Sequence, residues 1–220
     1  MLKYASAENG DREELLLMCE HSLTGAEAFT YLALNKDISG GRLWCAKNEN
    51  GHIASVIYDD GDFYIKAAGA QFSLFFSYRE KCFMVYEKKE IPESTAVDVS
   101  ETGIMDAFRL FCESCELSFD NEKRYVERRR AVNAGLACVF AVYDGTEMVS
   151  TASVSAENAD YAVISDVFTR KDKRNGGLAA RVLGSAVAYC LERGRTPVLL
   201  CEENMCSYYE KSGFKLYGKM

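Results

Sequence analysis

The chain has 220 residues, of which 48% are hydrophobic and 12% aromatic, so it can bury a core as one large domain or two small ones. Its formal net charge of -7 gives no net attraction to nucleic acid or to an anionic membrane surface, and neither is expected as a partner. Nine cysteines, several inside apolar runs, predict reduced thiols, and two histidines exclude a histidine-rich metal site.

The first half of the chain is predicted to contain two helices followed by an antiparallel meander. Apolar residues recur at helical spacing over residues 11–34, with a break near Thr24 and Gly25. Strand-like runs follow, separated by Asn50-Gly51 and Asp60-Gly61, which are typical of hairpin turns because these residues tolerate positive φ. The expected strands lie at residues 43–47, 52–58, 63–67 and 82–86, and a short helix lies at 71–79.

The second half repeats this order after a polar, weakly patterned segment at residues 92–102. That segment predicts a first domain of residues 1–100 and a second domain of residues 101–220. The repeated order indicates an internal duplication, in which only the second copy has a glycine-rich loop after its third strand. The expected helices lie at residues 104–115, 122–134 and 177–193, and the strands at 137–143, 148–155, 161–169 and 198–201.

Local patterns predict neither a nucleic-acid surface nor a membrane segment. The one basic run, Lys123-Arg124 with Arg128-Arg129-Arg130, falls at helical spacing beside acidic residues, which is typical of a solvated helix face. No apolar stretch approaches the ~20 residues that span a bilayer, and the N-terminus lacks the basic-then-apolar pattern of a signal peptide. A cytoplasmic location is therefore expected.

The loop from Arg174 to Ala179 has the chemistry of a phosphate site. It is expected to follow a strand and to open a helix, whose first backbone N–H groups and dipole favour an anion. Gly176 and Gly177 let the backbone close on phosphate oxygens, and Arg174 adds a charge that can bind them bidentately. The pattern predicts a pyrophosphate site.

Two motifs in the second half, taken together, identify a family. The first is Val167-Phe168-Thr169, then four residues, then Arg174-Asn175-Gly176-Gly177-Leu178-Ala179. The second, roughly 30 residues later, is Asn204-Met205-Cys206-Ser207-Tyr208-Tyr209-Glu210-Lys211-Ser212-Gly213-Phe214. They resemble the two signatures of the GNAT N-acyltransferases: Arg/Gln-x-x-Gly-x-Gly/Ala after a strand, and an asparagine followed by Tyr-Glu-Lys and Gly-Phe. The resemblance covers roughly the last 85 residues strongly and the first half only in outline.

The resemblance implies an α/β fold of α+β type and a site for acetyl-CoA without a metal. The GNAT fold has a mixed, mostly antiparallel sheet with helices on both faces, here expected in tandem halves. A backbone N–H near Val167 or Phe168, where the family's strand bulges and parts from its neighbour, would bind the developing oxyanion. Asn204 would hydrogen-bond the pantetheine or else cap the next helix. The implied cofactor-binding residues are Val167, Phe168, Thr169, Arg174, Asn175, Gly176, Gly177, Leu178, Ala179 and Asn204.

Two catalytic residues are predicted on the same basis. Tyr209 would protonate the departing thiolate, whereas Tyr208 is expected to pack inward. Asp166 is the first candidate for the base that takes a proton from the acceptor amine, and a structural role bonding a neighbouring strand stays open. Glu202 and Glu203 are the alternative candidates for the base. Attraction of a cationic substrate is the other role open to them.

The predicted function is transfer of an acetyl group from acetyl-CoA to a primary amine by direct attack. Small amines, amino-acid derivatives, aminoglycoside-like polyamines and peptide amines remain open as acceptors, and the acidic balance favours a cationic one. The first half is expected to shape the substrate cleft, with a homodimer interface as the alternative. A non-catalytic acyl-CoA-binding sensor or partner-binding module is the rival function, and an enzyme for longer acyl chains is a second rival.

Overall fold

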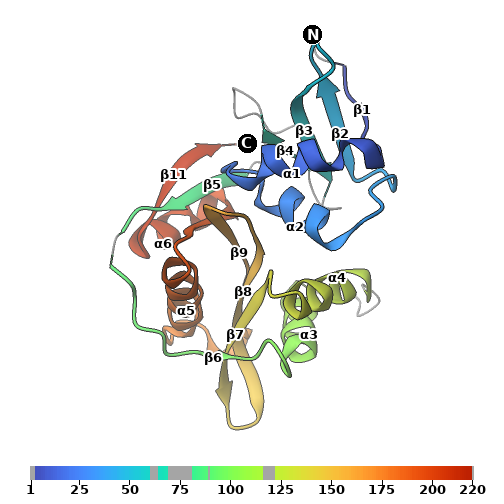
Figure 1. Cartoon of the computed structure of the whole chain (residues 1–220). Helices are drawn as coiled ribbons and strands as arrows, with labels where there is room; N and C mark the ends of the chain where they lie inside the picture. The colour runs from blue at the N-terminus through green and yellow to red at the C-terminus, as the bar shows by residue number, and fades with distance from the viewer. Residues whose placement is uncertain (1–2, 60–63, 69–80, 89, 116–121, 220) are drawn as a thin grey trace.

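The computed structural model describes residues 3–59, 64–68, 81–88, 90–115 and 122–219, and the side chains of 64–68 and 122–124 are not described. The predicted helix at 71–79 and the predicted turn at Asp60-Gly61 lie outside these ranges. Two sheets organise the chain (Figure 1).

The first sheet is antiparallel throughout and has the order β1-β2-β3-β4. Two helices pack on it, α1 (Arg12–Glu20) and α2 (Ala26–Leu34), with the predicted break between them. Gly25 is needed at this break because an added Cβ would stand 2.8 Å from the carbonyl oxygen of Cys19. Leu15, Leu32 and Val56 are among the fully buried side chains of this core. The strands are β1 (Ala5–Ser6), β2 (Leu43–Lys47), β3 (Ile53–Asp59) and β4 (Tyr64–Ala68).

The second sheet has the order β11-β5-β10-β9-β8-β7-β6. Its neighbours are antiparallel except for β9 and β10, which are parallel, so the sheet is mixed and mostly antiparallel as predicted. The strands are β5 (Lys81–Tyr86), β6 (Val97–Asp98), β7 (Cys138–Asp144), β8 (Glu147–Glu157), β9 (Tyr161–Thr169), β10 (Thr196–Glu202) and β11 (Phe214–Lys219).

Helices cover both faces of the second sheet, as Figure 1 shows for α5 on one side and α3 and α4 on the other. The apolar stripe of α5 (Leu178–Glu192), which includes Val182, Leu183 and Ala186, packs with α6 (Cys206–Lys211) on the larger core. On the opposite face, α3 (Ile104–Cys115) packs through Leu110 on Val139 and Ala141, and α4 (Glu122–Asn133) lies beside it.

Strand β5 lies in the sheet of the second half, although it precedes residue 100. It pairs antiparallel with β10 on one side and β11 on the other, and Cys82 lies opposite Cys201. Strand β6 also belongs to this sheet. The predicted boundary near residue 100 therefore does not coincide with the division between the sheets. The strand order β1-β2-β3-β4 corresponds to the order β6-β7-β8-β9, and in each set a pair of helices lies between the first and second strands along the chain. The duplication itself stays a prediction.

The two halves are joined by buried polar contacts at the end of β8. Thr30 of α2 donates to the carbonyl oxygen of Glu157 and accepts from its backbone N–H, at 3.1 and 3.0 Å. The Asn158 amide donates to the carbonyl oxygens of Cys19 and Ser22, both at 2.8 Å. Because these groups are buried, their hydrogen bonds hold the first half in a defined position against the second sheet.

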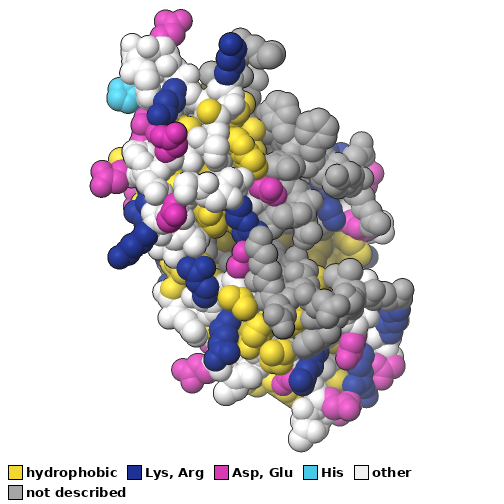
Figure 2. All heavy atoms as spheres, turned by 90° about the vertical axis from the view of Figure 1, so that its right-hand side faces the viewer, with side chains coloured by type: hydrophobic (Ala, Val, Ile, Leu, Met, Phe, Trp, Pro, Cys, Tyr) yellow, Lys and Arg dark blue, Asp and Glu magenta, His cyan; other side chains and the backbone are white. Residues whose placement is uncertain are grey.

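The surface mixes charges of both signs. Figure 2 shows acidic and basic side chains interspersed over the described part of one face, with no continuous basic area there. Among the described residues, none of the helices combines the length and apolar character needed to cross a membrane. The nine cysteines all fall within the described ranges and are free thiols.

Candidate active site

Strands β9 and β10 part where the predicted catalytic motif begins. Their parallel pairing runs from Tyr161 opposite Thr196 to Ile164 opposite Leu199. Beyond that point β9 continues to Thr169 and β10 to Glu202 without further pairing between these two described strands. A gap therefore opens between their carboxyl ends, inside an otherwise continuous sheet.

A β-bulge lies in β9 at this gap. Thr151 of β8 lies opposite Phe168, and Ser153 lies opposite Ser165, so β9 contains one residue more than its partner over this interval. Asp166 sits in the bulge with φ of 52°, which places it in the left-handed region. Val167 packs toward the core beneath α5, whereas the Phe168 ring lies 5.3 Å from that of Phe111 on the opposite face.

The predicted phosphate loop connects β9 to α5. Gly177 is the N-cap residue of α5 with φ of 75°, and Asn175 also has a positive φ of 66°. Arg174 to Gly177 are exposed, and Leu178 and Ala179 form the first turn of the helix. The first N–H groups of α5 therefore face a solvent-accessible loop without a capping side chain, as an anion site requires.

Arg174 is the basic residue of this loop that does not bind an acidic side chain among the described residues. Its Nε donates to the Thr169 carbonyl oxygen at 3.2 Å. Arg170 instead binds Glu147 and Asp172, and Lys173 binds Asp144 at 2.6 Å. Thr169 is itself buried, and its hydroxyl lies 2.8 Å from that of Ser150. These contacts brace the loop against the β7–β8 hairpin.

Parallel strand direction brings the second motif to the same edge of the sheet. Because β9 and β10 are parallel, the loop after β9 and the segment after β10 lie at one end of the sheet. Asn204 is exposed in a short 3-10 turn, and Met205, not Asn204, is the N-cap residue of α6. The capping role considered for Asn204 is therefore wrong, whereas its contact with pantetheine stays a prediction.

Tyr209 lies in the core beneath this edge, only 8% exposed. Its ring packs edge-on against Tyr208 and Phe214. Burial raises the pKa of Tyr209 well above its usual range, and the neighbouring Cys201 and Tyr208 act in the same direction. The phenol therefore stays protonated at neutral pH, as a proton donor must. Tyr208 packs partly inward, and its buried hydroxyl has no hydrogen-bond partner among the described residues.

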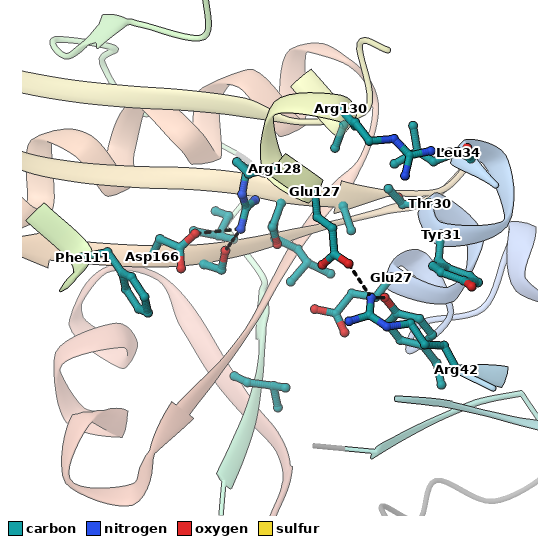
Figure 3. Close-up of a pocket in the computed structure, with 18 of the residues that line it drawn as sticks. Glu27, Thr30, Tyr31, Leu34, Arg42, Phe111, Glu127, Arg128, Arg130 and Asp166 are labelled. Atoms are coloured by element: carbon teal, nitrogen blue, oxygen red, sulfur yellow. Dashed lines mark hydrogen bonds and ion pairs between the residues drawn. The ribbon is translucent and has the colours of Figure 1, made fainter. Parts of the chain in front are cut away.

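A cavity of about 410 Å³ opens onto the other face of the bulge, between the two halves of the molecule (Figure 3). Asp166 and Phe168 of β9 and Leu200 of β10 line it from the second half, which connects it to the gap between those strands. The first half supplies Tyr31 and neighbouring residues of α2, together with Arg42 and Tyr58. The first half thus forms one wall of a cleft.

Asp166 forms an ion pair with an arginine of α4. Arg128 donates from Nη2 to Asp166 Oδ2 at 2.7 Å and to the Ser165 hydroxyl at 3.3 Å. Both charged side chains are 15% exposed. The interpretation of the basic run as a solvated face is therefore wrong for Arg128, although Arg129 and Arg130 are exposed. The charge of Arg128 is compensated by a carboxylate that lies about 40 residues later in the sequence.

Glu202 and Glu203, the alternative bases, are held elsewhere. Glu202 lies 3.7 Å from the Lys81 ammonium, across the β5–β10 pair. Glu203 pairs with Lys219, which lowers the pKa of its carboxyl. Neither glutamate lines the cavity among the described residues, so Asp166 is the candidate base with access to it.

The α2 residues of the cavity wall, and Arg42 just before β2, carry no motif that sequence alone could have marked. Arg42 donates from Nη1 to Glu127 Oε1 at 3.1 Å and lies over the Tyr31 ring. These residues are separated by many positions in the chain, and only the packing of α2 and α4 on β8 and β9 brings them together. In the described residues no three His, Cys, Asp or Glu side chains are grouped as a metal site would need.

Comparison with known proteins identifies the family. The model of the acetyltransferase (GNAT) family matches residues 104–214, just over half of the chain. The chain therefore belongs to the GNAT acetyltransferase family. No curated protein sequence matches it.

Solved structures extend the likeness to the whole fold. A GNAT-family acetyltransferase from Colwellia psychrerythraea has a TM-score of 0.61 and 8% identity, over 99% of this chain and 96% of that one. A GCN5-related N-acetyltransferase from Sphaerobacter thermophilus has a TM-score of 0.61 and 13% identity, over 99% and 93%. For a GNAT-family protein from Novosphingobium aromaticivorans, with a TM-score of 0.51 and 20% identity, the match covers 64% of this chain and 62% of that one.

Proposed function

We propose that the chain is an N-acetyltransferase that moves an acetyl group from acetyl-CoA to the primary amine of a small acceptor. The observation that carries this proposal is the parting of β9 and β10 at the bulge. The gap lies between the uncapped start of α5 on one side and the cavity between the two halves on the other. A thioester held in this gap would meet an amine that enters from the cavity.

The pyrophosphate of acetyl-CoA would bind at Arg174 to Ala179. The exposed first N–H groups of α5 and the positive φ of Gly177 support this assignment, since both let the backbone face an anion closely. An added Cβ at Gly176 would meet only the Lys173 carbonyl oxygen, at 3.7 Å, so the space beside Gly176 is open on the loop's outer side. The pantetheine would then run along the gap toward the bulge.

The transfer would proceed by direct attack. The acceptor nitrogen would form a bond to the thioester carbon, a backbone N–H near Val167 or Phe168 would stabilise the oxyanion, and the carbon–sulfur bond would then break. Tyr209 would donate a proton to the departing sulfur, the role that the resemblance of its motif to the family's implies. Asp166 would accept the proton that the amine releases, directly or through water, because it lines the cavity at the bulge.

The first test measures the thermal stability of the chain with and without acetyl-CoA and free CoA. A ligand that binds only the folded state raises its stability by mass action, and the assay needs no acceptor. A clear upward shift of the Tm with both ligands is expected. No shift at millimolar ligand would exclude the acyl-CoA site.

A second measurement separates the enzyme from a non-catalytic acyl-CoA sensor. Release of free thiol from acetyl-CoA, followed over a panel of amines, is expected for an enzyme and should depend on Tyr209. Binding of CoA without thiol release from any amine would favour the sensor instead. Faster turnover with a longer acyl-CoA than with acetyl-CoA would change the proposed acyl donor but leave the proposed reaction type intact.

A further inference from the structure

Charged residues of both signs line the cavity between the two halves, and their balance bears on the acceptor. Among the described residues, basic side chains outnumber acidic ones by four to three. The basic side chains are Arg42, Lys81, Arg128 and Arg130, and the acidic ones are Glu27, Glu127 and Asp166. Lys81 itself lies 3.7 Å from Glu202 outside the cavity, so the lining is close to neutral, whereas the chain as a whole has a net charge of -7.

Two of the acidic side chains are already bound by arginines of the same cavity. Arg42 binds Glu127 at 3.1 Å, and Arg128 binds Asp166 at 2.7 Å. The two arginines are 17% and 15% exposed, so their guanidinium groups are fixed parts of the wall. A polycation that entered the cavity would compete with these arginines for the carboxylates and meet like charge at short range.

Arg130 adds positive charge that binds neutral groups in the structure. Its Nη2 donates to the carbonyl oxygen of Leu34 at 2.9 Å and to the side-chain oxygen of Asn35 at 3.3 Å. These acceptors lie at the end of α2, where the partial negative charge of the helix terminus favours a guanidinium. A guanidinium has five N–H donors, so Arg130 retains donors for an anionic ligand.

The charges lie in a definite order along the cavity. Figure 3 shows Arg128 and Asp166 beside Phe111 at one end. Toward the other end lie Arg130, Tyr31 and Arg42, with Glu27 and Glu127 next to Arg42. The amine must react at the Asp166 end, because that end opens onto the gap between β9 and β10. Any anionic group of the acceptor would then lie toward Arg42 and Arg130, with aromatic rings beside the body of the molecule.

We infer that the acceptor is a small amine that also carries a carboxylate at some distance from the amine, namely a short peptide. This inference rests on the proposed function and narrows its acceptor class. It replaces the cationic acceptor that the overall charge favoured, because the local charge of the cavity, not the net charge of the chain, determines which ligand is stabilised there. The carboxylate binds Arg130 and Arg42, and the amine lies at Asp166.

The test compares acceptors that differ only in the carboxylate. Short peptides are assayed beside their C-terminal carboxamides and beside spermidine, with thiol release from acetyl-CoA as the readout. The free acids are expected to have a kcat/KM at least tenfold above that of the carboxamides. Equal or faster turnover of the carboxamides or of spermidine would overturn the inference while leaving the acetyltransferase intact.

Matched variants connect the preference to the named arginines. Arg130→Gln should reduce the ratio of kcat/KM between free acid and carboxamide by about tenfold and leave CoA affinity unchanged. Arg129→Gln, an exposed neighbour that does not line the cavity among the described residues, is the control and should retain the ratio. Arg42→Gln should act like Arg130→Gln, and an unchanged ratio in both variants contradicts the inference.

A binding measurement separates the failure of this inference from failure of the proposed reaction. Calorimetric titration of the same free acids and carboxamides into the CoA-bound protein requires no turnover. If the free acids bind and Arg130→Gln abolishes that binding, the carboxylate site is supported even where no thiol is released. The absence of thiol release would then count only against the proposed enzymatic reaction. Equal binding of acid and carboxamide would count against the carboxylate site.

Discussion

The guanidinium of Arg128 lies 2.7 Å from the carboxylate of Asp166 and ties helix α4 to the bulge of β9. The pair thereby links the helix that walls the acceptor cavity to the strand segment that would meet the thioester. Because both side chains are 15% exposed, each would leave a poorly solvated charge behind if the other were removed.

Arg128→Met should therefore destabilise the protein and weaken catalysis. We expect a loss of about 3 kcal/mol in the free energy of unfolding, measured with urea, since removal of one partner of a buried pair costs this much. Turnover should fall while CoA affinity stays unchanged. Arg129→Met on the exposed side of the same helix should leave both quantities near the wild-type values, and an equal loss in the two variants would show that the pair is not responsible.

Asp166→Asn and Asp166→Ala separate the charge of this residue from its backbone conformation. Asparagine tolerates the positive φ of 52° at the bulge, whereas alanine pays about 1 kcal/mol of strain there. Both variants should lose turnover if Asp166 accepts the proton. Both variants leave Arg128 without its carboxylate and should lose stability, and the alanine variant should lose about 1 kcal/mol more than the asparagine variant. Full activity in Asp166→Asn would assign the residue a structural role alone.

Gly176→Val should weaken CoA binding at least tenfold, roughly 1.4 kcal/mol, because the new side chain occupies the space of the pyrophosphate. The fold should survive, since the nearest atom to an added Cβ is the Lys173 carbonyl oxygen at 3.7 Å. Calorimetry gives the affinity and thermal unfolding gives the stability. Gly40→Val, in an exposed turn with nothing within 4 Å of an added Cβ, is the control. Unchanged affinity in Gly176→Val would move the site elsewhere.

Tyr209→Phe should lower kcat by at least tenfold with little change in CoA affinity, because it removes the proton donor and keeps the ring in the core. Tyr208→Phe is the matched control on the same helix. Its buried hydroxyl has no hydrogen-bond partner among the described residues, so its removal should leave activity intact and raise stability by up to about 1 kcal/mol. Stopped-flow thiol detection measures kcat, and urea unfolding measures the stability of the two variants.

Alkaline pH should destabilise the fold through its buried thiols. Burial raises the pKa of Cys138 to about 12, whereas a thiol of the unfolded chain titrates near ~8.5. Above that pH the unfolded state binds fewer protons than the folded state, so the free energy of unfolding falls as the pH rises toward 12. Each such thiol changes the unfolding equilibrium by up to about tenfold per pH unit.

Cys138→Ala provides the check on this pH dependence. The variant is less stable at neutral pH because it loses a buried side chain, but its decline between pH 9 and 11 should be shallower than that of the wild type. Urea unfolding at a series of pH values measures the slope. Identical slopes would assign the alkaline loss to other groups.

The elements of the second half could be predicted because each has a local signal. The apolar spacing of α5 follows the helical period, and the strands from β7 to β10 alternate or run apolar between turn residues. The loop at Gly176 and Gly177 could be predicted as the connection from β9 to α5, because glycines favour such a turn, and its role as a phosphate site stays a prediction. The bulge at Asp166 followed from the family resemblance and not from the residues themselves.

The acceptor cavity and the position of β5 could not be predicted, because both depend on contacts between distant residues. Lys81 to Tyr86 has the pattern of a strand, but nothing in it specifies pairing with β10 and β11. Arg128 has the spacing of a solvated helix face, and only its contact with Asp166 shows otherwise. Tertiary packing determines such features, and local pattern does not record it.

The position of β5 has a consequence for the order in which the chain can fold during synthesis. Cys82 leaves the ribosome about 120 residues before its partner Cys201, so β5 must wait for β10 and β11 while the first sheet, complete by residue 68, can already form. Pairing across so long a separation is slow, and the unpaired strand is open to association with other chains in the meantime. The gap between β9 and β10 likewise forms only after β10 has left the ribosome.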